Sequence, residues 1–553
     1  MWVSRISQRP VPTYRDLAVG ACQALLRLWG GSPRGSVKRH VFFAAALAII
    51  SGAAIYVGAP YASRYAEDYG QFLDGGWRLL NGQRPHLDFY SPYGVFVYVP
   101  ITLGLALAHD VRGMGYGNAL MALLAGVWAY GVARRRLTSS ASIFAALSLA
   151  LLACAPYPLG QFPNVLSYAM IYNRQSYALL GILLIEAYPA VEDGARRSRA
   201  ELAGGLSSGA VCGILFFLKP TYFLAAVTLL AAGLFLRPVR RERLLALAAG
   251  FSAVALATLW YLRFDVGAVL RDMAMVAGAR TGGLFMDSLG QRSVASSFEL
   301  LMLLICAILT PRKRDAKVSG WRQRFLQNPG LAYAAVLSAL GFLLLWTNWQ
   351  DSGLPLNPLF AIMLASPIAV SRAPGETKEG TERANVRAGL VLILALIVAI
   401  PRFASDVLGM AIAVQDTRHT RLTHAALFDA PPVVRLMVPD WYALYLRDGI
   451  DLLRRASGSQ ETVACLDFDN PFGYALQRPP FRGGSPAMQY GYTFSDTHRP
   501  TAEWLLGGAD VVLVPKRPIL PLEPLMRNYS EFLHQRFRLA AESSQWFLYR
   551  RVR

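Results

Sequence analysis

The chain is poor in cysteine, in charge and above all in acidic residues. Five cysteines occur among 553 residues, and they are scattered, without the spacing of a metal site or an obvious disulfide partner. Charged residues make up 16% of the chain, with 35 acidic against 55 basic side chains. A P-loop and paired His/Cys zinc ligands are missing. The soluble nucleotide-binding and zinc-site classes are therefore not expected.

The chain is rich in hydrophobic residues. Hydrophobic residues make up 54% of the chain, its mean hydropathy is +0.33, and apolar runs of about 20 residues recur along most of its length. This composition is typical of a polytopic membrane protein. A net charge of +20 is also typical of proteins that bind nucleic acid, but here the arginines lie in short loops between apolar runs. That is the positive-inside pattern, so no nucleic-acid partner is expected.

The basic loops predict how the chain crosses the bilayer. Residues 1–40 are basic and are expected in the cytoplasm, and residues 41–59 read as a retained signal anchor. Two apolar runs lie between this segment and the basic loop at Arg134. If both crossed the membrane, that basic loop would lie outside the cytoplasm, so the positive-inside rule allows only one of them to span. Residues 95–108 are shorter and contain Pro100, so we expect them to form an interfacial helix inside an external loop, residues 60–113. After Arg134, apolar runs alternate regularly with basic loops, and this pattern predicts about eleven membrane spans up to residue 405.

The composition changes after residue 405. Apolar runs shrink to strand length at 462–466, 510–514 and 546–549, with helical patterns at 433–455 and 525–540 between them. We therefore predict a mainly α fold: a polytopic membrane helical bundle of residues 41–405, with interfacial helices and a small C-terminal soluble α/β domain of residues 406–553. An odd number of spans places that domain outside the cytoplasm.

The external loop carries a dense set of polar motifs. Glu67, Asp68 and Tyr69 follow the first span, the segment GQRPHLDF occupies residues 82–89, and a Ser-Pro-Tyr segment occupies residues 91–93. Polar residues gathered at a membrane face usually mark chemistry or transport. Together with the layout of the whole chain, this loop resembles the GT-C class of integral-membrane glycosyltransferases, such as protein O-mannosyltransferases and the aminoarabinose transferase of lipid A. His86 stands where Tyr is more usual in these motifs, and Ser-Pro-Tyr replaces Pro-Pro.

The resemblance implies an activity. A GT-C enzyme moves a sugar from a polyprenyl-phosphate donor to a lipid, glycan or protein acceptor, with or without a divalent metal such as Mg or Mn. The expected location is the bacterial inner membrane, with the active site and the C-terminal domain in the periplasm. By resemblance Asp68 matches the catalytic acid and would act as general base. Glu67 and Asp88 are further catalytic candidates. A solvated acid at a helix start would explain Asp68 equally simply, and an Asx-turn would explain Asp88.

Other polar side chains are candidates for binding the substrate. A lipid-phosphate donor needs fixed cations, and polar groups near the bilayer can hydrogen-bond a sugar. Snorkelling, solvated loops or the aromatic belt would explain these residues without a ligand. No metal ligands are assigned. Asp467 and Asp469 are read as acids at a strand end that open a turn. The substrate-binding candidates are Arg174, Lys219, Arg280, Arg292, Asn348, Gln350, Tyr69 and His86.

Three other functions fit a multispan chain. A lipid-linked-sugar flippase or transporter would need a polar path through the spans, which carry few charges apart from Lys219. An O-antigen polymerase or ligase usually places its basic residues in later loops and lacks a soluble C-terminal α/β domain. A membrane scaffold with an external binding domain would not require acidic motifs in the first loop, so these motifs argue against a scaffold. The sequence therefore favours the glycosyltransferase.

Overall fold

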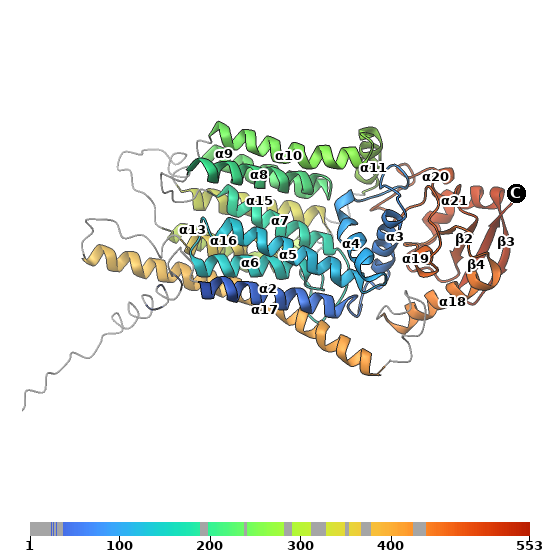
Figure 1. Ribbon diagram of the computed structural model, residues 1–553, viewed down its shortest axis with the longest axis horizontal. Helices are drawn as coiled ribbons and strands as arrows, with labels where there is room; N and C mark the ends of the chain where they lie inside the picture. Colours follow the sequence, from blue (N-terminus) through green and yellow to red (C-terminus); the bar gives the residue numbers. More distant parts are fainter. Residues whose placement is uncertain are drawn as a thin grey trace, which may run out of the picture.

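The protein consists of a bundle of helices and a small domain with a four-stranded sheet at one end of it (Figure 1). The computed structural model describes residues 37–188, 197–236, 240–280, 290–310, 328–348, 353–366, 378–423 and 438–552, together with residues 24, 26 and 29. The C-terminus lies at the far side of the sheet domain, away from the bundle.

Apolar helices make this a membrane-embedded protein. Helices long and apolar enough to cross a membrane are α2 (Val37–Val57), α5 (Gly113–Ala133), α10 (Arg241–Tyr261), α15 (Pro329–Thr347) and, within α17 (Lys378–Thr423), the stretch Asn385–His419. Shorter apolar helices are η1 and α4 (Val95–Val97, Val99–Ala108), α6 (Ser139–Cys154), α9 (Pro220–Leu236), α13 (Ser297–Leu309) and α16 (Leu356–Ala365). The bundle also contains α7 (Ile171–Ala187) and α8 (Arg197–Phe216). The expected count of about eleven spans stays a prediction.

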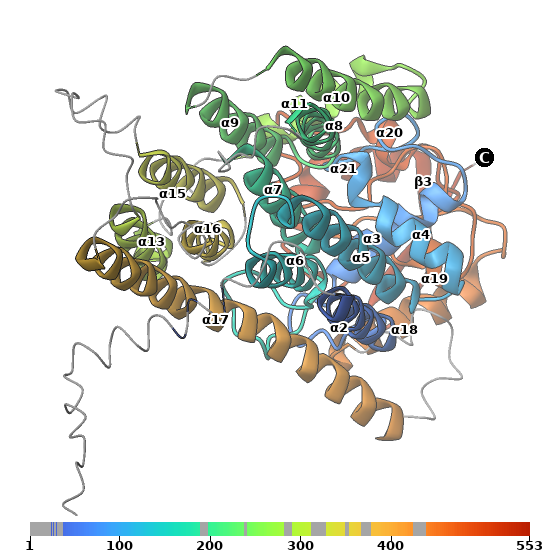
Figure 2. The same ribbon diagram turned by 60° about the vertical axis from the view of Figure 1, so that its left-hand side comes forward.

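Small residues let the bundle helices approach closely. A Cβ built on Gly209 of α8 would overlap the carbonyl oxygen of Leu247 on α10, and one on Gly250 would overlap that of Leu206. Inside a bilayer there is no hydrophobic force between helices, so close backbone packing of this kind stabilises their association. Figure 2 shows α8 and α10 side by side, which agrees with these contacts.

The long loop after α2 is folded, and it lies between the bundle and the sheet domain. Helix α3 (Asp68–Leu80) begins at Asp68, a turn segment follows, and η1 and α4 lead into α5. Figures 1 and 2 show α3 and α4 at the end of the bundle that carries the C-terminal domain. A second helix, α11 (Val266–Ala279), lies in the segment between α10 and α13 at this end of the bundle. Helices thus support both loops at this end.

The C-terminal domain is α/β, as the short apolar runs predict. Its sheet has the strand order β1 (Val463–Cys465), β2 (Val511–Pro515), β4 (Trp546–Arg551), β3 (Phe537–Glu542). Strands β1 and β2 are parallel, and β4 pairs antiparallel with β2 and β3. Its helices are α18 (Asp440–Ala456), α19 (Phe472–Ala475), α20 (Ala502–Leu506) and α21 (Glu523–Arg536).

A buried aromatic group fixes α18 on this sheet. The ring of Trp546 lies 4.3 Å from that of Tyr445 and 5.1 Å from that of Phe472. Its indole nitrogen donates a 3.0 Å hydrogen bond to the carbonyl oxygen of Tyr445, so the large ring is buried with its polar group satisfied. Residues on the inner face of α18 therefore have defined positions relative to β1.

A buried arginine ties α3 to the C-terminal domain. Arg78 is 1% exposed, and its Nε pairs with Asp74 at 2.8 Å. Its Nη1 donates to the carbonyl oxygens of Gly483 at 2.8 Å and Phe481 at 3.3 Å. Trp77 on the same helix donates to the carbonyl oxygen of Arg478 at 2.8 Å. One side of α3 is thus hydrogen-bonded to the loop that follows α19.

Replacing Arg78 should loosen the two parts of the protein. In Arg78→Met the Asp74 carboxylate stays buried without its partner, which costs about 3–5 kcal/mol. We expect a clearly lower unfolding temperature in detergent. Arg482→Gln is the control, because that side chain is 74% exposed and lies 3.7 Å from Asp88, so little change is expected. Equal unfolding temperatures for the two variants would contradict this role.

Candidate active site

The acidic motif of the first loop forms the beginning of α3. Glu67 is the N-cap residue and Asp68 is the first residue of the helix. The partial positive charge of a helix N-terminus stabilises carboxylates at these positions. Gln71 donates a short hydrogen bond from Nε2 to the Oδ1 of Asp68. Burial, and then the neighbouring Glu67, raise the pKa of Asp68 well above its usual value, and burial also raises the pKa of Glu67.

Two tyrosines continue from Asp68 towards the bundle. The Oε1 of Gln71 accepts a 3.2 Å hydrogen bond from the hydroxyl of Tyr93. The ring of Tyr93 lies 5.0 Å from that of Tyr172, which belongs to the first turn of α7. Asp68 and Gln71 therefore lie on one side of a pair of aromatic rings.

Lys219 contacts the second of these rings, that of Tyr172. It occupies the turn between α8 and α9, and its Nζ is 5.0 Å from the ring centre of Tyr172. The same Nζ donates a 3.2 Å hydrogen bond to Asn173, and no carboxylate pairs with it among the described residues. The first loop is fixed against this turn, because the Gly94 amide donates to the carbonyl oxygen of Leu218 at 3.1 Å. Asp68, through Gln71, and Lys219 thus both approach the Tyr93–Tyr172 pair.

Arg280 joins the same group. It follows α11, and it lies close enough to Lys219 and Tyr93 to act on both electrostatically. Its Nη1 donates to the carbonyl oxygen of Thr347 at 2.8 Å. Its Nε is buried and has no hydrogen-bond partner among the described residues. A buried donor without a partner is costly, so this nitrogen is suited to a ligand.

Arg292 and Asn348 lie beside Arg280 at the end of α15. The Nη1 of Arg292 donates to the carbonyl oxygens of Leu345 at 3.1 Å and Asn348 at 3.4 Å. The Asn348 side chain donates to Leu344, and its Oδ1 is buried without a partner among the residues that the structure describes. Arg292 therefore binds main-chain carbonyl oxygens, whereas the side-chain oxygen of Asn348 is available to accept a hydrogen bond from a ligand. Gln350 lies outside the described residues.

The structure does not bring Arg174 to this group, which corrects our expectation. The side chain is 1% exposed, and its Nη2 forms an ion pair with Asp406 of α17. The remaining donors bind the carbonyl oxygens of Leu152 at 2.9 Å and Tyr157 at 3.0 Å. Asp406 in turn accepts a 2.6 Å hydrogen bond from the hydroxyl of Tyr157. Arg174 thus fastens α7 to α17, and its neighbour Asn173 contacts Lys219.

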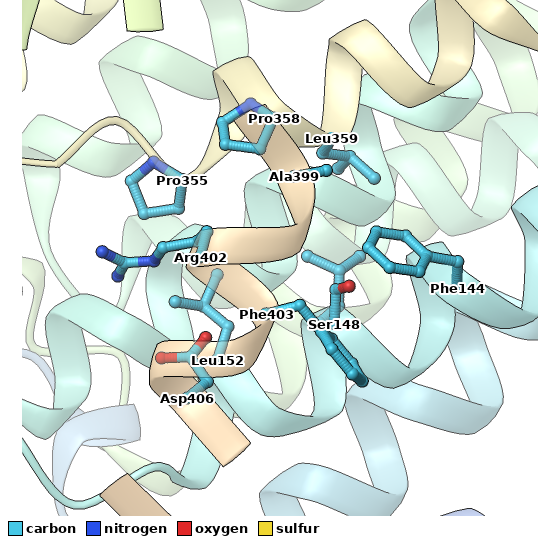
Figure 3. Close-up of a pocket in the computed structure, with 11 residues that line it drawn as sticks. Phe144, Ser148, Leu152, Pro355, Pro358, Leu359, Ala399, Arg402, Phe403 and Asp406 are labelled. Atoms are coloured by element: carbon cyan, nitrogen blue, oxygen red, sulfur yellow. The ribbon is translucent and has the colours of Figure 1, made fainter. Parts of the chain in front are cut away.

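A small cavity lies beside this ion pair (Figure 3). Residues of α6, α16 and α17 line it, with Arg402 and Asp406 towards one end and Phe144 and Phe403 among the apolar walls. It encloses about 30 Å³, which is room for one or two water molecules. The cavity is therefore too small for a lipid-linked sugar, and neither Asp68 nor Lys219 lines it.

Three further candidates stabilise the first loop. Tyr69 donates its hydroxyl to the carbonyl oxygen of Pro60 and is fully buried. The Nδ1 of His86 lies 3.0 Å from Asp272 of α11, inside the protein. Asp88 accepts hydrogen bonds from the backbone and side chain of Arg84, at 2.9 and 3.2 Å. These partners give the three residues structural roles, and the assignment of Tyr69 and His86 to substrate and of Asp88 to catalysis stays a prediction.

Two acids of the C-terminal domain complete the site, and the sequence reading did not assign them a function. The Oδ2 of Asp469 lies against Gly70 in the first turn of α3, so that a Cβ built there would overlap it. Tyr442 donates to Asp469 at 3.0 Å, and Tyr445 donates to Asp467. Burial raises the pKa of Asp467 to about 6 and, helped by Asp467, raises that of Asp469 well above its usual value.

This acidic group is not arranged like a metal site. Among the residues that the structure describes, no three His, Cys, Asp or Glu side chains are placed to hold one metal ion. The site geometry therefore assigns no ligands to the divalent metal that the resemblance leaves open.

Comparisons with known proteins give matches in solved structures only. No protein-family model and no curated protein matches the sequence. The structure is similar to ArnT from Cupriavidus metallidurans, solved with undecaprenyl phosphate, at 11% identity over 94% of this chain and 99% of ArnT, with a TM-score of 0.48. It is also similar to the arabinosyltransferase EmbB from Mycobacterium smegmatis, at 14% identity over 79% of this chain and 46% of EmbB, with a TM-score of 0.37.

A third match is the oligosaccharyltransferase AglB from Archaeoglobus fulgidus, solved with an inhibitory peptide and a dolichol-phosphate. Identity is 12% over 87% of this chain and 70% of AglB, with a TM-score of 0.33. The three are glycosyltransferases of the class that the loop motifs resemble. Because identity is this low and the TM-scores are below 0.5, the activity of this chain is argued from its own site.

The structural role of Arg174 can be tested with a pair of variants. Arg174→Met should cost about 3–5 kcal/mol of stability, because Asp406 stays buried without its cation. The double variant Arg174→Met/Asp406→Leu should recover most of the unfolding temperature in detergent. A double variant no more stable than Arg174→Met would contradict this structural role.

Proposed function

We propose that the protein is a membrane glycosyltransferase that moves a sugar from a polyprenyl-phosphate donor to a lipid, glycan or protein acceptor. One observation carries the proposal. A carboxylate with a raised pKa and two basic side chains, Lys219 and Arg280, lie around the Tyr93–Tyr172 pair. The transfer of a sugar from a lipid phosphate needs both kinds of group close together.

Asp68 is the general base of the proposed reaction. An acceptor hydroxyl or amine attacks the anomeric carbon of the donor and gives its proton to the carboxylate as the new glycosidic bond forms. The Gln71 amide, which donates to Oδ1, holds this carboxylate in one orientation. One base without a second nucleophile suits a single displacement, so the proposal includes inversion at the sugar carbon.

Lys219 and Arg280 bind the phosphate. When the bond from the anomeric carbon to the phosphate oxygen breaks, the lipid phosphate leaves with the electron pair, and its charge is stabilised by fixed cations. Lys219 is 7% exposed and has no carboxylate partner among the described residues, and the Nε of Arg280 is unpaired. A polar or charged side chain kept buried in this way is costly unless a ligand completes it. The free Oδ1 of Asn348, beside Arg280, is placed to accept a hydrogen bond from a sugar hydroxyl.

The location of the site suits a lipid donor. Asp68 begins α3, two residues before the contact of Gly70 with Asp469 of the C-terminal domain, and Lys219 lies in the turn between α8 and α9 of the bundle. The lipid tail can therefore stay among apolar helices while the sugar lies beneath the domain. We place this end of the molecule at the periplasmic face of the inner membrane, because the basic loops at the other ends of the helices fit the cytoplasm.

Asp68→Asn tests the base. The amide keeps the shape of the side chain but cannot accept the acceptor proton, so transfer should fall by about 10²–10⁴-fold. The assay measures sugar transfer in membranes from a panel of polyprenyl-phosphate-linked pentoses and hexoses. Asp88→Asn, in the same loop but paired with Arg84, should keep most of the activity. A folded Asp68→Asn enzyme with wild-type turnover would remove Asp68 from this role.

Lys219→Met and Arg280→Met test the phosphate site. Each substitution removes a charge-assisted hydrogen bond, and we expect affinity for polyprenyl phosphate to fall by about 10- to 100-fold. Binding is measured on purified protein by titration with the lipid phosphate alone. Arg482→Gln, on the exposed surface of the C-terminal domain, should bind like the wild type. Unchanged affinity in both Lys219→Met and Arg280→Met would refute this phosphate site.

A further inference from the structure

The closest contact between the acidic end of α3 and the C-terminal domain is made by Asp469. Its Oδ2 lies against Gly70, two residues from Asp68, at a distance that leaves no room for a Cβ. Tyr442 of α18 donates to the same oxygen at 3.0 Å. Asp469 is 3% exposed, so this carboxyl group is enclosed when the domain is in place.

The chain around Asp469 holds it in this position. The next residue, Asn470, donates from Nδ2 to the carbonyl oxygen of Val463 in β1 at 2.9 Å. Tyr442 lies on α18, whose buried face packs on the sheet, and its ring stacks on that of Tyr445 at 6.1 Å. The carboxyl group is thus part of a rigid surface of the C-terminal domain that is pressed onto the first turn of α3.

The groups around Asp469 are acidic or neutral. Glu67 and Asp68 act on it from the start of α3, Asp467 acts on it from its own segment, and Tyr442 donates to it from α18. None of the ion pairs among the described residues includes any of these acids. Like charges at such distances cannot all stay ionised in a buried place, so one or more carries a proton.

We infer that Asp469 is a positioning residue for Asp68: its protonated carboxyl group seats the C-terminal domain on the first turn of α3, and its ionised form is repelled from that place. The inference rests on the proposed role of Asp68 as base. Asp469 does not touch the reacting atoms. It holds the helix end from which Asp68 and Gln71 project, and it does so only while it is neutral.

The direction of the pH effect follows from the burial. Burial and the neighbouring carboxylates raise the pKa of Asp469 in the seated state above its value when the domain is displaced. Seating therefore takes up a proton. Its advantage is complete below the ordinary pKa of the carboxyl group, and it is lost as pH rises through the raised pKa. Asp68 works in the opposite sense, because a base must be ionised, so activity should rise and then fall with pH.

Asp469→Asn separates the two effects, because asparagine has the shape of a protonated aspartate and stays neutral. The wild-type enzyme should lose activity on the alkaline side by about tenfold for each pH unit, and the variant should lack that limb or show it at higher pH. Glu531→Gln, an exposed acid on α21, is the control and should follow the wild type. An alkaline limb at the same pH in Asp469→Asn, or none in the wild type up to about pH 10, would overturn the inference.

Thermal unfolding gives a readout that does not depend on catalysis. The unfolding temperature of Asp469→Asn minus that of the wild type should grow as pH rises, whereas a constant difference would contradict proton-dependent seating. This measurement keeps the inference testable even if Asp68→Asn stays active, a result that would refute the proposed base but not the seating.

Gly70→Ala tests the contact itself. The added Cβ would overlap the Oδ2 of Asp469, so the variant should lose turnover more than donor affinity. Gly70→Ala/Asp469→Ala removes the obstructing carboxyl group and should regain part of the loss. As a control, Gly52→Ala on α2 has open space at its Cβ and should be silent. A double variant no better than Gly70→Ala would show that another group makes the contact.

Discussion

The burial of several carboxyl groups against one helix end is the constraint on which the site depends. Glu67 and Asp68 of the first loop meet Asp469 of the C-terminal domain with no ion-paired cation among the described residues. Such a group is unstable alone, and three features offset its cost. The α3 dipole favours negative charge at this end, and tyrosine hydroxyls donate to the acids of the domain. At the other end of α3, Arg78 fastens the helix to the C-terminal domain by donating to the carbonyl oxygens of Phe481 and Gly483.

Charge is separated across the site rather than paired. The acids lie under the C-terminal domain, Lys219 contacts the ring of Tyr172, and both Asp68 and Arg280 act electrostatically on Tyr93. Salt bridges between these groups would satisfy both sides and leave nothing for a ligand. Arg174 shows the contrast, because it is buried too, but its guanidinium group pairs with Asp406 and donates to two backbone carbonyl oxygens. The proposed function uses this difference between a cation with a partner and one without.

Much of the fold could be predicted from the sequence, because the local signals were strong. Apolar runs predicted the helices of the bundle, and strand-length runs predicted β1, β2 and β4. The acidic motif indicated a helix start at Asp68, where α3 begins. Strand β3 was read as the end of a helix, because its residues favour helix and only pairing with β4 makes them a strand. Helix α11 was not predicted, although most of its residues are apolar.

The site could be predicted only in part. Asp68 was selected by the resemblance, Lys219 because it is an ionisable residue in an apolar stretch, where it is costly without a function, and Arg280 as a basic residue of the external face; their roles stay predictions. The same reasoning also selected Arg174, because a sequence does not show that Asp406 lies opposite it. Asp469 lies about 400 residues from Asp68, and only the seating of the C-terminal domain on α3 brings them together.

A structure of the protein with bound polyprenyl phosphate would test the central claim most directly. The phosphate should lie within about 4 Å of Lys219 and Arg280, on the side of Tyr93 and Tyr172 that leaves the anomeric carbon of a donor facing Asp68. A phosphate bound instead at Arg402 in the cavity of Figure 3, or far from Asp68 altogether, would contradict the account.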